Sequence, residues 1–501
     1  MIDYKQFKSG TDIRGVASEG VENEHINLTD EVICTITDAF LVWLSDKLQK
    51  PAQQMKISVG HDSRISADRI KNDVISTLVS RGVWVVDCSL ASTPSMFMTT
   101  VEIGCDAAVQ ITASHHPFNR NGLKFFVRSG GLDGADISDI LAKAAAGEKV
   151  EAKEGKCEKY DFMKDYAKIL RQLIISKTGS DKPLEGFRIV VDAGNGAGGF
   201  YAYDVLEPLG ANINGSQFLE PDGMFPNHIP NPENEQAMAS ISAATVNSGA
   251  DLGVIFDTDV DRASCVDNKG REINRNRIVA LAAAIALEGN EGGTVVTDSV
   301  TSAGLKTFIE ADLKGKHHRF KRGYKNVIDE SIRLNNEGIL SPLAIETSGH
   351  AAFSENYFLD DGAYLITKII IKMAQLKKEG KTIDDLIKNL KEPVEAKELR
   401  FKITDPDFRS YGMGVISDLE SYAKNKGWDI APDNHEGIRI SFGDNMGNGW
   451  FLLRLSVHDP IMPLNIESDV EGGVMVIAKQ LYEFLKGCDK LDLSAIENFI
   501  K

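Results

Sequence analysis

The sequence predicts an α/β protein of three successive α/β domains with mixed βαβ sheets, followed by a C-terminal α+β domain, all arranged around a central cleft. At 501 residues the chain is too long for one core, so several domains are expected. Apolar runs of strand length alternate with helical patterns through most of the chain, which is typical of βαβ units. The last quarter has helices beside short strands instead, which favours a small antiparallel sheet.

Each predicted domain contains its own set of these elements. The first has strands at 56–60 and 83–88 around a helix at 67–79, and the second has strands at 187–193 and 211–214 around a helix at 200–209. The third begins with a helix at 277–287, a strand at 293–297 and a further helix. The last contains helices at 416–426 and 474–485 and strands at 437–442, 449–455 and 465–467. The predicted domains are therefore 1–155, 156–270, 271–390 and 391–501.

Composition and charge exclude several classes of protein. With 42% hydrophobic and 26% charged residues, the chain is expected to be folded and globular. A formal net charge of −17 argues against nucleic acid or an anionic membrane as the main partner. The N-terminus has no apolar signal core, and runs such as 278–287 are too short to span a bilayer. The six scattered cysteines form no CxxC pair, so a cytoplasmic location is expected.

A first candidate site follows the apolar strand Ala107–Ile111, in the run Thr112-Ala113-Ser114-His115-His116-Pro117. A hydroxyl at a strand end, flanked by small residues, is accessible to a ligand. Nearby histidines and Lys124 can gather phosphate oxygens and exchange protons. The alternative for this segment alone is a polar turn between two strands.

A second candidate site is Asp257-Thr258-Asp259-Val260-Asp261-Arg262, directly after the apolar strand Leu252–Phe256. Three carboxylates at alternate positions can converge on one hard cation such as Mg²⁺, and the arginine can bind a phosphate. The alternative is a solvated acidic turn, in which the carboxylates would repel each other. An EF-hand fits poorly, because Arg262 and Asn268 occupy its glycine and glutamate positions.

Two weaker signals lie in the second half of the chain. Glu346, Ser348 and His350 follow the strand Leu343–Ile345 in a turn where Gly349 permits close backbone approach, a set suited to sugar hydroxyls. Arg454, Ser456 and His458 follow a strand and could form a phosphate-binding turn.

One glycine pattern suggests a different function. The run Gly194-Asn195-Gly196-Ala197-Gly198-Gly199 satisfies the G-x-G-x-x-G pattern of dinucleotide sites. Such a site requires an acidic residue at the end of the following strand. Glu220 instead lies beyond that strand, in a Pro/Gly-rich loop. The run is therefore interpreted as a structural strand-to-helix turn.

The four segments in this order resemble the α-D-phosphohexomutase superfamily, which includes phosphoglucomutases, phosphomannomutases and phosphoglucosamine mutases. The resemblance covers essentially the whole chain from Thr11-Asp12-Ile13-Arg14-Gly15 onward. It implies interconversion of hexose 1-phosphate and hexose 6-phosphate, of mannose and/or glucose, through phosphorylated Ser114 and a bisphosphorylated sugar. The small-molecule partner is then a sugar phosphate, the cofactor one Mg²⁺ per chain, and the activator a hexose 1,6-bisphosphate. The chain is expected to be a monomer or a weak homodimer.

The resemblance also implies a role for each matching residue. Asp257, Asp259 and Asp261 are the expected metal ligands, together with a phosphoryl oxygen on Ser114. Proton transfer and phosphate stabilisation fall to Lys124 and His115, with Arg14 and Arg262 at the active centre. Sugar recognition falls to Glu346, Ser348 and His350, and phosphate binding to Arg454, Ser456 and His458.

The sequence departs from the family pattern at several positions. His116 and His61 stand where Asn and Arg are common, Thr347 occupies a position that tends to separate substrate classes, and the Arg454–Pro460 loop is unusual. Three alternatives stay open: a phosphoglucosamine mutase, a metal-dependent sugar phosphatase with Asp257 as nucleophile, and a non-catalytic sugar-phosphate sensor. The phosphatase would leave Ser114 and the Arg454 loop without a role.

Overall fold

The computed structural model describes residues 2–456 and 459–501, which form two compact units. The first unit comprises Met1–Ile285 and Ser348–Asp385, and the second comprises Ala286–Thr347 and Leu386–Lys501. The secondary structure is that of three α/β domains and a C-terminal α+β domain, which confirms the predicted fold class. Among the described residues, no helix has both the length and the apolar character to cross a bilayer.

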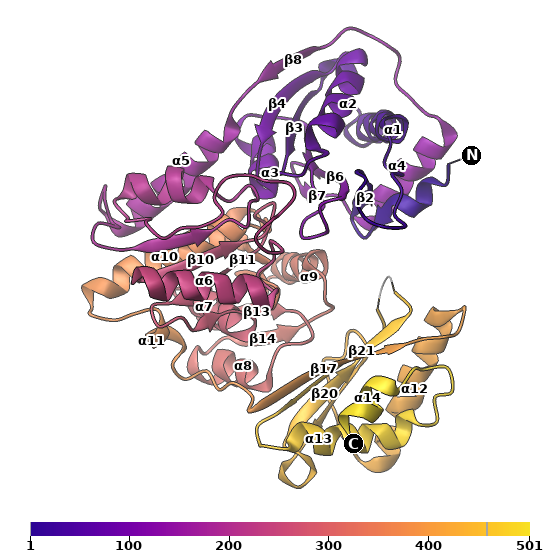
Figure 1. Ribbon diagram of the computed structural model, residues 1–501, viewed down its shortest axis with the longest axis vertical. Coiled ribbons are helices and arrows are strands. Elements are labelled where there is room, and N and C mark those ends of the chain that lie inside the picture. The colour runs from indigo at the N-terminus through magenta and orange to yellow at the C-terminus, as the bar shows by residue number, and fades with distance from the viewer. Residues whose placement is uncertain (1, 457–458) are drawn as a thin grey trace. The chain divides into compact units, whose positions relative to one another are not determined.

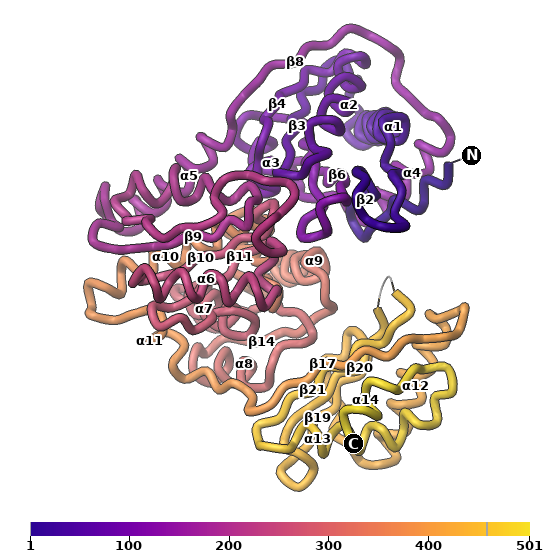
Figure 2. The backbone as a smooth tube through the Cα atoms, viewed as in Figure 1, coloured from indigo at the N-terminus to yellow at the C-terminus, as the bar shows by residue number. Residues whose placement is uncertain are grey.

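The N-terminal sheet of the first unit is mixed, with strand order β1-β2-β6-β5-β3-β4-β8 and β7 paired to β6 (Figure 1). Its strands are Lys8–Ser9, Asp12–Val16, Lys56–His61, Trp84–Leu90, Ala107–Ile111, Arg120–Val127, Gly130–Gly131 and Lys156–Lys159, numbered β1 to β8 in chain order. Its helices are α1 (Asp30–Leu48), α2 (Ala67–Ser80), α3 (Thr93–Glu102) and α4 (Gly134–Ala146). The backbone trace shows β8 returning along the edge of the sheet beside β4 (Figure 2). The first sheet therefore continues past residue 155.

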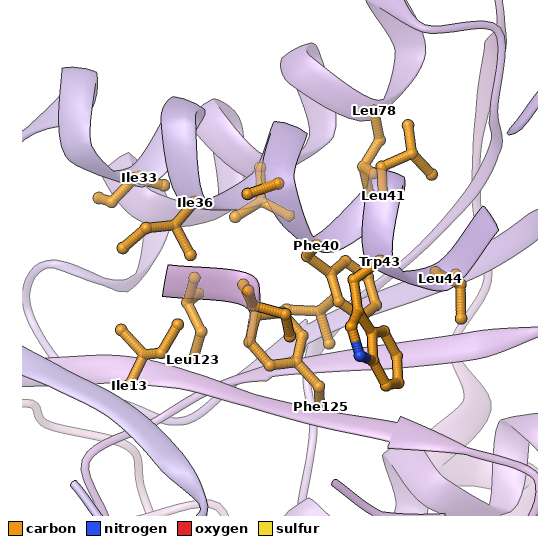
Figure 3. Packing of buried hydrophobic residues seen from close by; sticks show 14 of the residues in the cluster. Ile13, Ile33, Ile36, Phe40, Leu41, Trp43, Leu44, Leu78, Leu123 and Phe125 are labelled. Atoms are coloured by element: carbon orange, nitrogen blue, oxygen red, sulfur yellow. The ribbon is translucent and has the colours of Figure 1, made fainter. Parts of the chain in front are cut away.

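A large apolar cluster fixes the strands that carry the first candidate site. Helix α1 places Ile33, Ile36 and Phe40 on one face, because residues three and four apart share a side of a helix. The Phe40 and Phe125 rings stack with their centroids 4.3 Å apart, and Leu123 packs in the same cluster (Figure 3). Leu123 and Phe125 belong to β6, so this packing holds the strand that follows the Ser114 loop in register with β5, the strand that precedes the loop.

The second sheet of the first unit has the order β12-β11-β10-β9. Its strands are β9 (Ile189–Asp192), β10 (Leu252–Phe256), β11 (Ala263–Asp267) and β12 (Glu272–Ile273), and the accompanying helices are α5 (Phe162–Thr178), α6 (Glu235–Ser248) and α10 (Gly362–Lys378). Strands β9 and β10 are parallel, whereas β10 and β11 form a hairpin with Phe256 opposite Ala263. The acidic motif is therefore the whole of the hairpin loop. The short strand β16 (Ala351–Phe353) lies in the same unit, and α7 (Asn276–Leu287) ends at its boundary.

The second unit contains a parallel sheet and an antiparallel one. The parallel strands are β13 (Thr294–Thr297), β14 (Lys316–Arg319) and β15 (Leu343–Ile345), with helices α8 (Ala303–Thr307) and α9 (Tyr324–Asn336). The antiparallel sheet has the order β17-β21-β20-β19-β18. Its strands are β17 (Glu395–Lys402), β18 (Asp429–Ile430), β19 (Ile438–Phe442), β20 (Gly449–Leu453) and β21 (Ile461–Ser468). One face of this sheet is covered by α12 (Phe408–Lys426), α13 (Gly473–Leu485) and α14 (Ser494–Phe499) (Figure 1).

Short helical segments complete the description of the chain. They are Tyr4–Phe7, Ala52–Gln54, Tyr201–Leu206, Glu207–Leu209, Phe308–Asp312, Asp384–Ile387 (α11), Ser354–Asn356 and Asp444–Met446.

The structure differs from the sequence predictions in three places. The predicted strand at 211–214 is wrong, because only Asn212 bridges to Arg188 before the chain turns at Gly215, whose φ is 107°. The predicted helix at 200–209 is a π-helical turn followed by a 3₁₀ turn that contains Pro208, whose missing amide interrupts regular helix hydrogen bonding. In the C-terminal domain, strand β17 and helix α14 were not predicted.

Candidate active site

The loop that carries Ser114 joins β5 to β6 and is held by one buried arginine. Arg64 is only 2% exposed and donates hydrogen bonds to the carbonyl oxygens of Ser114 (2.5 Å), His116 (2.7 Å) and Pro117 (2.6 Å). The Asp62 carboxylate accepts a hydrogen bond from Arg64 Nε at 3.2 Å and orients the guanidinium. The loop is thus fixed by its backbone, which leaves its side chains available for chemistry.

Ser114 has an unusual backbone conformation within this loop. Its φ of 49° lies in the left-handed region, which is uncommon for a residue other than glycine. Its amide donates to Thr112 Oγ1 at 2.9 Å. Its hydroxyl lies 3.3 Å from Asp257 Oδ2 and accepts a hydrogen bond from Arg262 Nη2 at 2.8 Å. The structure therefore brings the first and second sequence motifs together around one hydroxyl oxygen.

The β10–β11 loop gathers three buried carboxylates. Asp257, Asp259 and Asp261 are at most 1% exposed, and one oxygen from each lies within 4.8 Å of the others. Val260 has a φ of 67°, rare for a β-branched residue, and this turn allows the alternate aspartates to converge. Oδ1 of Asp259 and Oδ1 of Asp261 accept no hydrogen bond among the described residues.

These carboxylates fit a divalent cation. Burial and the charges of Asp261 and Asp259 raise the pKa of Asp257 well above its usual value. A hard cation bound by these oxygens would offset the like charges, and oxygen ligands of this kind suit Mg²⁺. The arrangement thus has the chemistry of a metal site.

Two neighbouring cations partly balance the acidic loop, and a third supports the Ser114 loop. Lys124 Nζ lies 2.8 Å from Asp261 Oδ2, and Arg262 Nε lies 3.1 Å from Asp257 Oδ2. Burial raises the pKa of Asp261, but the charges of Lys124, His350 and Arg262 together outweigh this, and the resulting pKa is lowered. Arg14 lies on β2, pairs with Asp12 at 2.7 Å and donates to the carbonyl of Thr112 at the base of the Ser114 loop.

His115 also lies beside the Ser114 hydroxyl. Its Nδ1 is 3.4 Å from Ser114 Oγ and 2.5 Å from Arg262 Nη2. Because a guanidinium only donates, Nδ1 must be the acceptor in this contact. Desolvation and the charge of Arg262 lower the pKa of His115, so the ring is neutral.

The first unit also contains Ser348 and His350 of the third sequence motif. Nδ1 of His350 contacts the Asp360 carboxylate and lies 3.9 Å from Asp261 Oδ1. Burial disfavours the charged ring, but Asp360 and Asp261 outweigh this and raise the pKa of His350 to about 9. His350 is therefore placed against the acidic loop. Ser348 is buried and its hydroxyl has no hydrogen-bond partner among the described residues.

The second unit contains Glu346 and the Arg454 loop. Glu346 accepts a hydrogen bond from the Gly323 amide at 2.6 Å, and Thr347 Oγ1 donates to Asp298 Oδ2 at 2.8 Å. Burial and the charge of Glu346 raise the pKa of Asp298 to about 7. Oδ1 of this carboxyl accepts no hydrogen bond among the described residues.

Arg454 and Ser456 of the fourth sequence motif follow strand β20. Arg454 is half-buried, and its Nε has no partner in the described part of the chain. Burial lowers the pKa of Arg454, against the opposing charge of Glu436. Ser456 donates its amide to the Ile461 carbonyl at 3.0 Å. His458, the remaining predicted residue of this motif, lies outside the described residues.

Several residues around these motifs were missed by the sequence reasoning. Thr93 begins α3, and its Oγ1 donates to Asp259 Oδ2 at 2.5 Å while its amide donates to the Asp259 carbonyl at 2.8 Å. Arg64, Asp298 and Asp360 are the others. Asp298 follows β13 directly, and that position could have identified it, whereas Arg64 lies three residues after β3.

The glycine-rich run packs directly behind the acidic loop. A Cβ on Gly196 would lie 2.5 Å from the Thr258 carbonyl oxygen, and the Ala197 amide donates to that oxygen at 2.8 Å. Gly194 has a φ of 52°, and a side chain there would contact Pro230. Close backbone packing thus accounts for two of these glycines.

Comparison with known proteins assigns the chain to a family. Models of the phosphoglucomutase/phosphomannomutase α/β/α domains I, II and III match residues 5–151, 164–270 and 274–394. A phosphoglucomutase/phosphomannomutase of Thermococcus kodakarensis is 30% identical over 92% of this chain and 94% of its own length. A phosphomannomutase/phosphoglucomutase of Pseudomonas putida is 28% identical over 83% of this chain and 84% of its own length. A crystal structure of a family protein from Burkholderia thailandensis superposes with a TM-score of 0.79 and 25% identity, covering 97% of this chain and 98% of the other. The chain therefore belongs to the phosphoglucomutase/phosphomannomutase family.

Proposed function

We propose that this protein is a phosphohexomutase that interconverts hexose 1-phosphates and hexose 6-phosphates, of mannose and/or glucose, through phosphorylated Ser114. The observation that carries the proposal is the Ser114 hydroxyl, which contacts both Arg262 at 2.8 Å and Asp257 at 3.3 Å. An oxygen fixed between a cation and a carboxylate cluster is suited to exchange of a phosphoryl group, because such transfer depends on positioning and charge stabilisation.

The reaction consists of two transfers. In the first, the bond between phosphorus and Ser114 Oγ breaks, phosphorus bonds to a sugar hydroxyl oxygen, and the proton of that hydroxyl is transferred to Ser114 Oγ, giving a sugar bisphosphate. In the second, the bond between the other phosphorus and the turned sugar breaks, this phosphorus bonds to Ser114 Oγ, and the serine proton is transferred to the sugar oxygen. We assign proton transfer and phosphate stabilisation to Lys124 and His115, and charge stabilisation to Arg262 and Arg14.

Asp257, Asp259 and Asp261 would hold one Mg²⁺ together with a phosphoserine oxygen. When bound, the ion would supply positive charge against the charge that develops on the phosphoryl oxygens. We propose hexose 1,6-bisphosphate as the activator, because it can phosphorylate Ser114 in the resting enzyme.

Substrate recognition is assigned to the remaining motifs. Glu346, Ser348 and His350 would bind sugar hydroxyls, with His350 acting from beside the acidic loop. Arg454, whose Nε is not committed to another described group, would bind the phosphate that is not being transferred, together with Ser456. The role of His458 remains a prediction.

Four further expectations belong to this proposal. They are the domain boundaries at residues 155, 270 and 390, a cytoplasmic location, a monomer or weak homodimer, and the absence of nucleic-acid or membrane partners.

The test uses wild type, Ser114→Ala and the control Ser421→Ala, which removes an exposed hydroxyl from α12. Each protein is incubated with Mg²⁺, a trace of hexose bisphosphate and either glucose 1-phosphate or mannose 1-phosphate, and followed by ³¹P NMR. We expect 6-phosphate without free phosphate in wild type and the control, and a loss of several orders of magnitude in Ser114→Ala. Free phosphate that persists in Ser114→Ala would contradict the mechanism and favour a phosphatase acting through Asp257. Running glucosamine 1-phosphate in parallel tests the phosphoglucosamine mutase alternative.

A further inference from the structure

A separate cavity of about 520 Å³ lies within the second unit. One part of its wall comes from α8 and β14, and the other from β18, β19, β20 and the end of β21. None of the proposed catalytic or substrate-binding residues lines it. The cavity therefore needs its own explanation.

A buried arginine with uncommitted donors forms part of the wall. Arg439 is 5% exposed, and its guanidinium carbon lies 3.5 Å from the ring centroid of Trp450. Its Nη1 donates to the carbonyls of Ser299 (3.1 Å) and Thr301 (3.0 Å). Its Nε and Nη2 donate to no acceptor in the described part of the chain. Keeping a buried charge with unused donors is costly, and an anion would satisfy both.

Strand β14 brings two more basic side chains to the same cavity. His317 and Arg319 alternate along the strand, so they share one face, and both line the cavity. Arg319 is 5% exposed and donates to Thr301 Oγ1 at 3.1 Å and to the Ser302 carbonyl at 2.9 Å. His317 is 9% exposed. Its Nε2 lies 2.8 Å from Thr297 Oγ1, while its Nδ1 has no hydrogen-bond partner among the described residues. If the threonine hydroxyl donates to Nε2, the neutral ring offers Nδ1–H as a further donor.

Acidic side chains also line the cavity, close to the basic ones, so its wall is divided between positive and negative groups. Asp433 lies 3.4 Å from Arg319 Nη1, and Glu467 Oε2 accepts a hydrogen bond from Trp450 Nε1 at 3.0 Å. Asp429 and Asp469 are also in the wall. A ligand with one anionic end and hydroxyl or amino donors elsewhere matches this division. A wholly apolar or cationic ligand does not.

We propose that this cavity binds a small phosphate-bearing anion whose oxygens contact Arg439 and His317. The volume exceeds that of a single phosphate, so an ester with a polar body can be accommodated. Such an anion would also affect the proposed substrate site, because Arg439 holds the carbonyl of Ser299, the residue after Asp298, and Asp298 in turn holds Thr347. The cavity would then act as an effector site.

The test follows Trp450 directly in the full-length protein. The chain has four tryptophans, so 5-fluorotryptophan labelling gives a small set of ¹⁹F resonances, and Trp450→Phe assigns the one beside Arg439. Inorganic phosphate and, separately, adenosine monophosphate are titrated into wild type, Arg439→Gln, His317→Gln and the exposed control Lys479→Gln. His317→Gln keeps an amide that can contact Thr297 but removes the unpartnered ring nitrogen.

We expect a saturable shift of the Trp450 resonance with at least one probe in wild type and in Lys479→Gln. The apparent Kd should rise about tenfold or more in Arg439→Gln, as for loss of charge-assisted hydrogen bonds, and by less in His317→Gln. A shift with phosphate alone identifies a free oxyanion, and a shift with the nucleotide alone identifies an ester. No shift with either probe, or equal Kd values in a folded Arg439→Gln and wild type, would overturn the proposal.

If Arg439→Gln has lost its cooperative thermal transition, the Kd of His317→Gln is used in its place. A Kd higher than that of wild type supports the proposal, and an equal Kd overturns it. The readout requires no turnover, so it stands apart from the outcome of the mutase assay.

Discussion

The Ser114–Asp257 group in the first unit and the Asp298–Arg454 group in the second are built on different principles. In the first, the backbone of the Ser114 loop is bound by Arg64 and the carboxylates are held by Lys124, Arg262 and Thr93. Its Asp259 Oδ1 and Asp261 Oδ1, which have no hydrogen-bond partner in the described chain, belong to proposed metal ligands. In the second group, Asp298 Oδ1 and Arg454 Nε are left without hydrogen-bond partners among the described residues. The first arrangement is fixed before any substrate binds, which suits stabilisation of a transition state. The second keeps polar groups available, which suits recognition of a ligand that arrives and leaves.

The largest effect is expected from Asp261→Asn. This change removes one proposed metal ligand and leaves the Lys124 charge without its carboxylate partner at 2.8 Å. We expect kcat to fall by at least about 1,000-fold, with weakened Mg²⁺ binding. Steady-state kinetics and titration calorimetry with Mg²⁺ measure the two quantities, with the exposed Asp181→Asn as control. Unchanged Mg²⁺ affinity would contradict the assignment of the metal site.

Arg64→Ala tests whether the Ser114 loop depends on its buried support. The substitution removes the side-chain donor to the Ser114, His116 and Pro117 carbonyls and to Asp62 Oδ2. The backbone amides of residue 64 and Arg120 still donate to Asp62 Oδ1 and to the Pro117 carbonyl. We expect a loss of about 3 kcal/mol in the free energy of unfolding, together with a fall in kcat that exceeds any change in KM. Urea unfolding and kinetics check this, and Arg128→Ala serves as the exposed control. Normal kcat in a destabilised variant would show that the loop does not need this support for catalysis.

Gly196→Ala should weaken the proposed metal site although it replaces none of the proposed metal ligands. The added methyl would lie 2.5 Å from the Thr258 carbonyl, so the acidic loop must shift. We expect Mg²⁺ affinity to fall about tenfold, an effect of the size seen when groups that orient ligands are changed. The matched control is Gly414→Ala on α12, where a Cβ meets nothing within 4 Å. Equal Mg²⁺ affinity in the two variants would show that the glycine turn does not position the loop.

The smallest effect is expected from Asp298→Asn in the second group. Because the pKa of Asp298 is raised to about 7, the wild-type group gains negative charge as the pH rises through neutrality. That charge should oppose an anionic substrate, so KM should increase between about pH 6 and 8 in wild type. Asparagine resembles the protonated acid and should give a flatter KM profile with nearly unchanged kcat. An identical pH profile in both proteins would contradict the role of Asp298.

Residues that act through local spacing could be predicted from the sequence, whereas residues that act through partners remote in sequence could not. The three aspartates and Arg262 lie in one hairpin loop, so their spacing alone brings them together, and Ser114 is identified by its position after a buried strand. Arg64 acts on carbonyls of a loop that is remote in sequence, and no local pattern records such a contact. Asp298 is likewise defined by a partner, Thr347, on another strand end.

The errors in secondary structure have a related cause. The segment 211–214 has the composition of a strand, but the turn at Gly215 limits its pairing to single bridges with neighbouring backbone. Strand β17 is missed because five of its eight residues have exposed side chains, which interrupt any apolar run, and because its position depends on pairing with β21. Pairing across the sheet, rather than local preference, decides both cases.

The left-handed backbone of Ser114 also restricts which hydroxyl amino acid can occupy that position. Threonine carries an equivalent hydroxyl, but its β-branch disfavours a φ of 49° more than serine does. Replacement by threonine would therefore retain a hydroxyl group but move its oxygen away from Arg262. Main-chain shape at this position disfavours threonine independently of any difference in reactivity between the two hydroxyls.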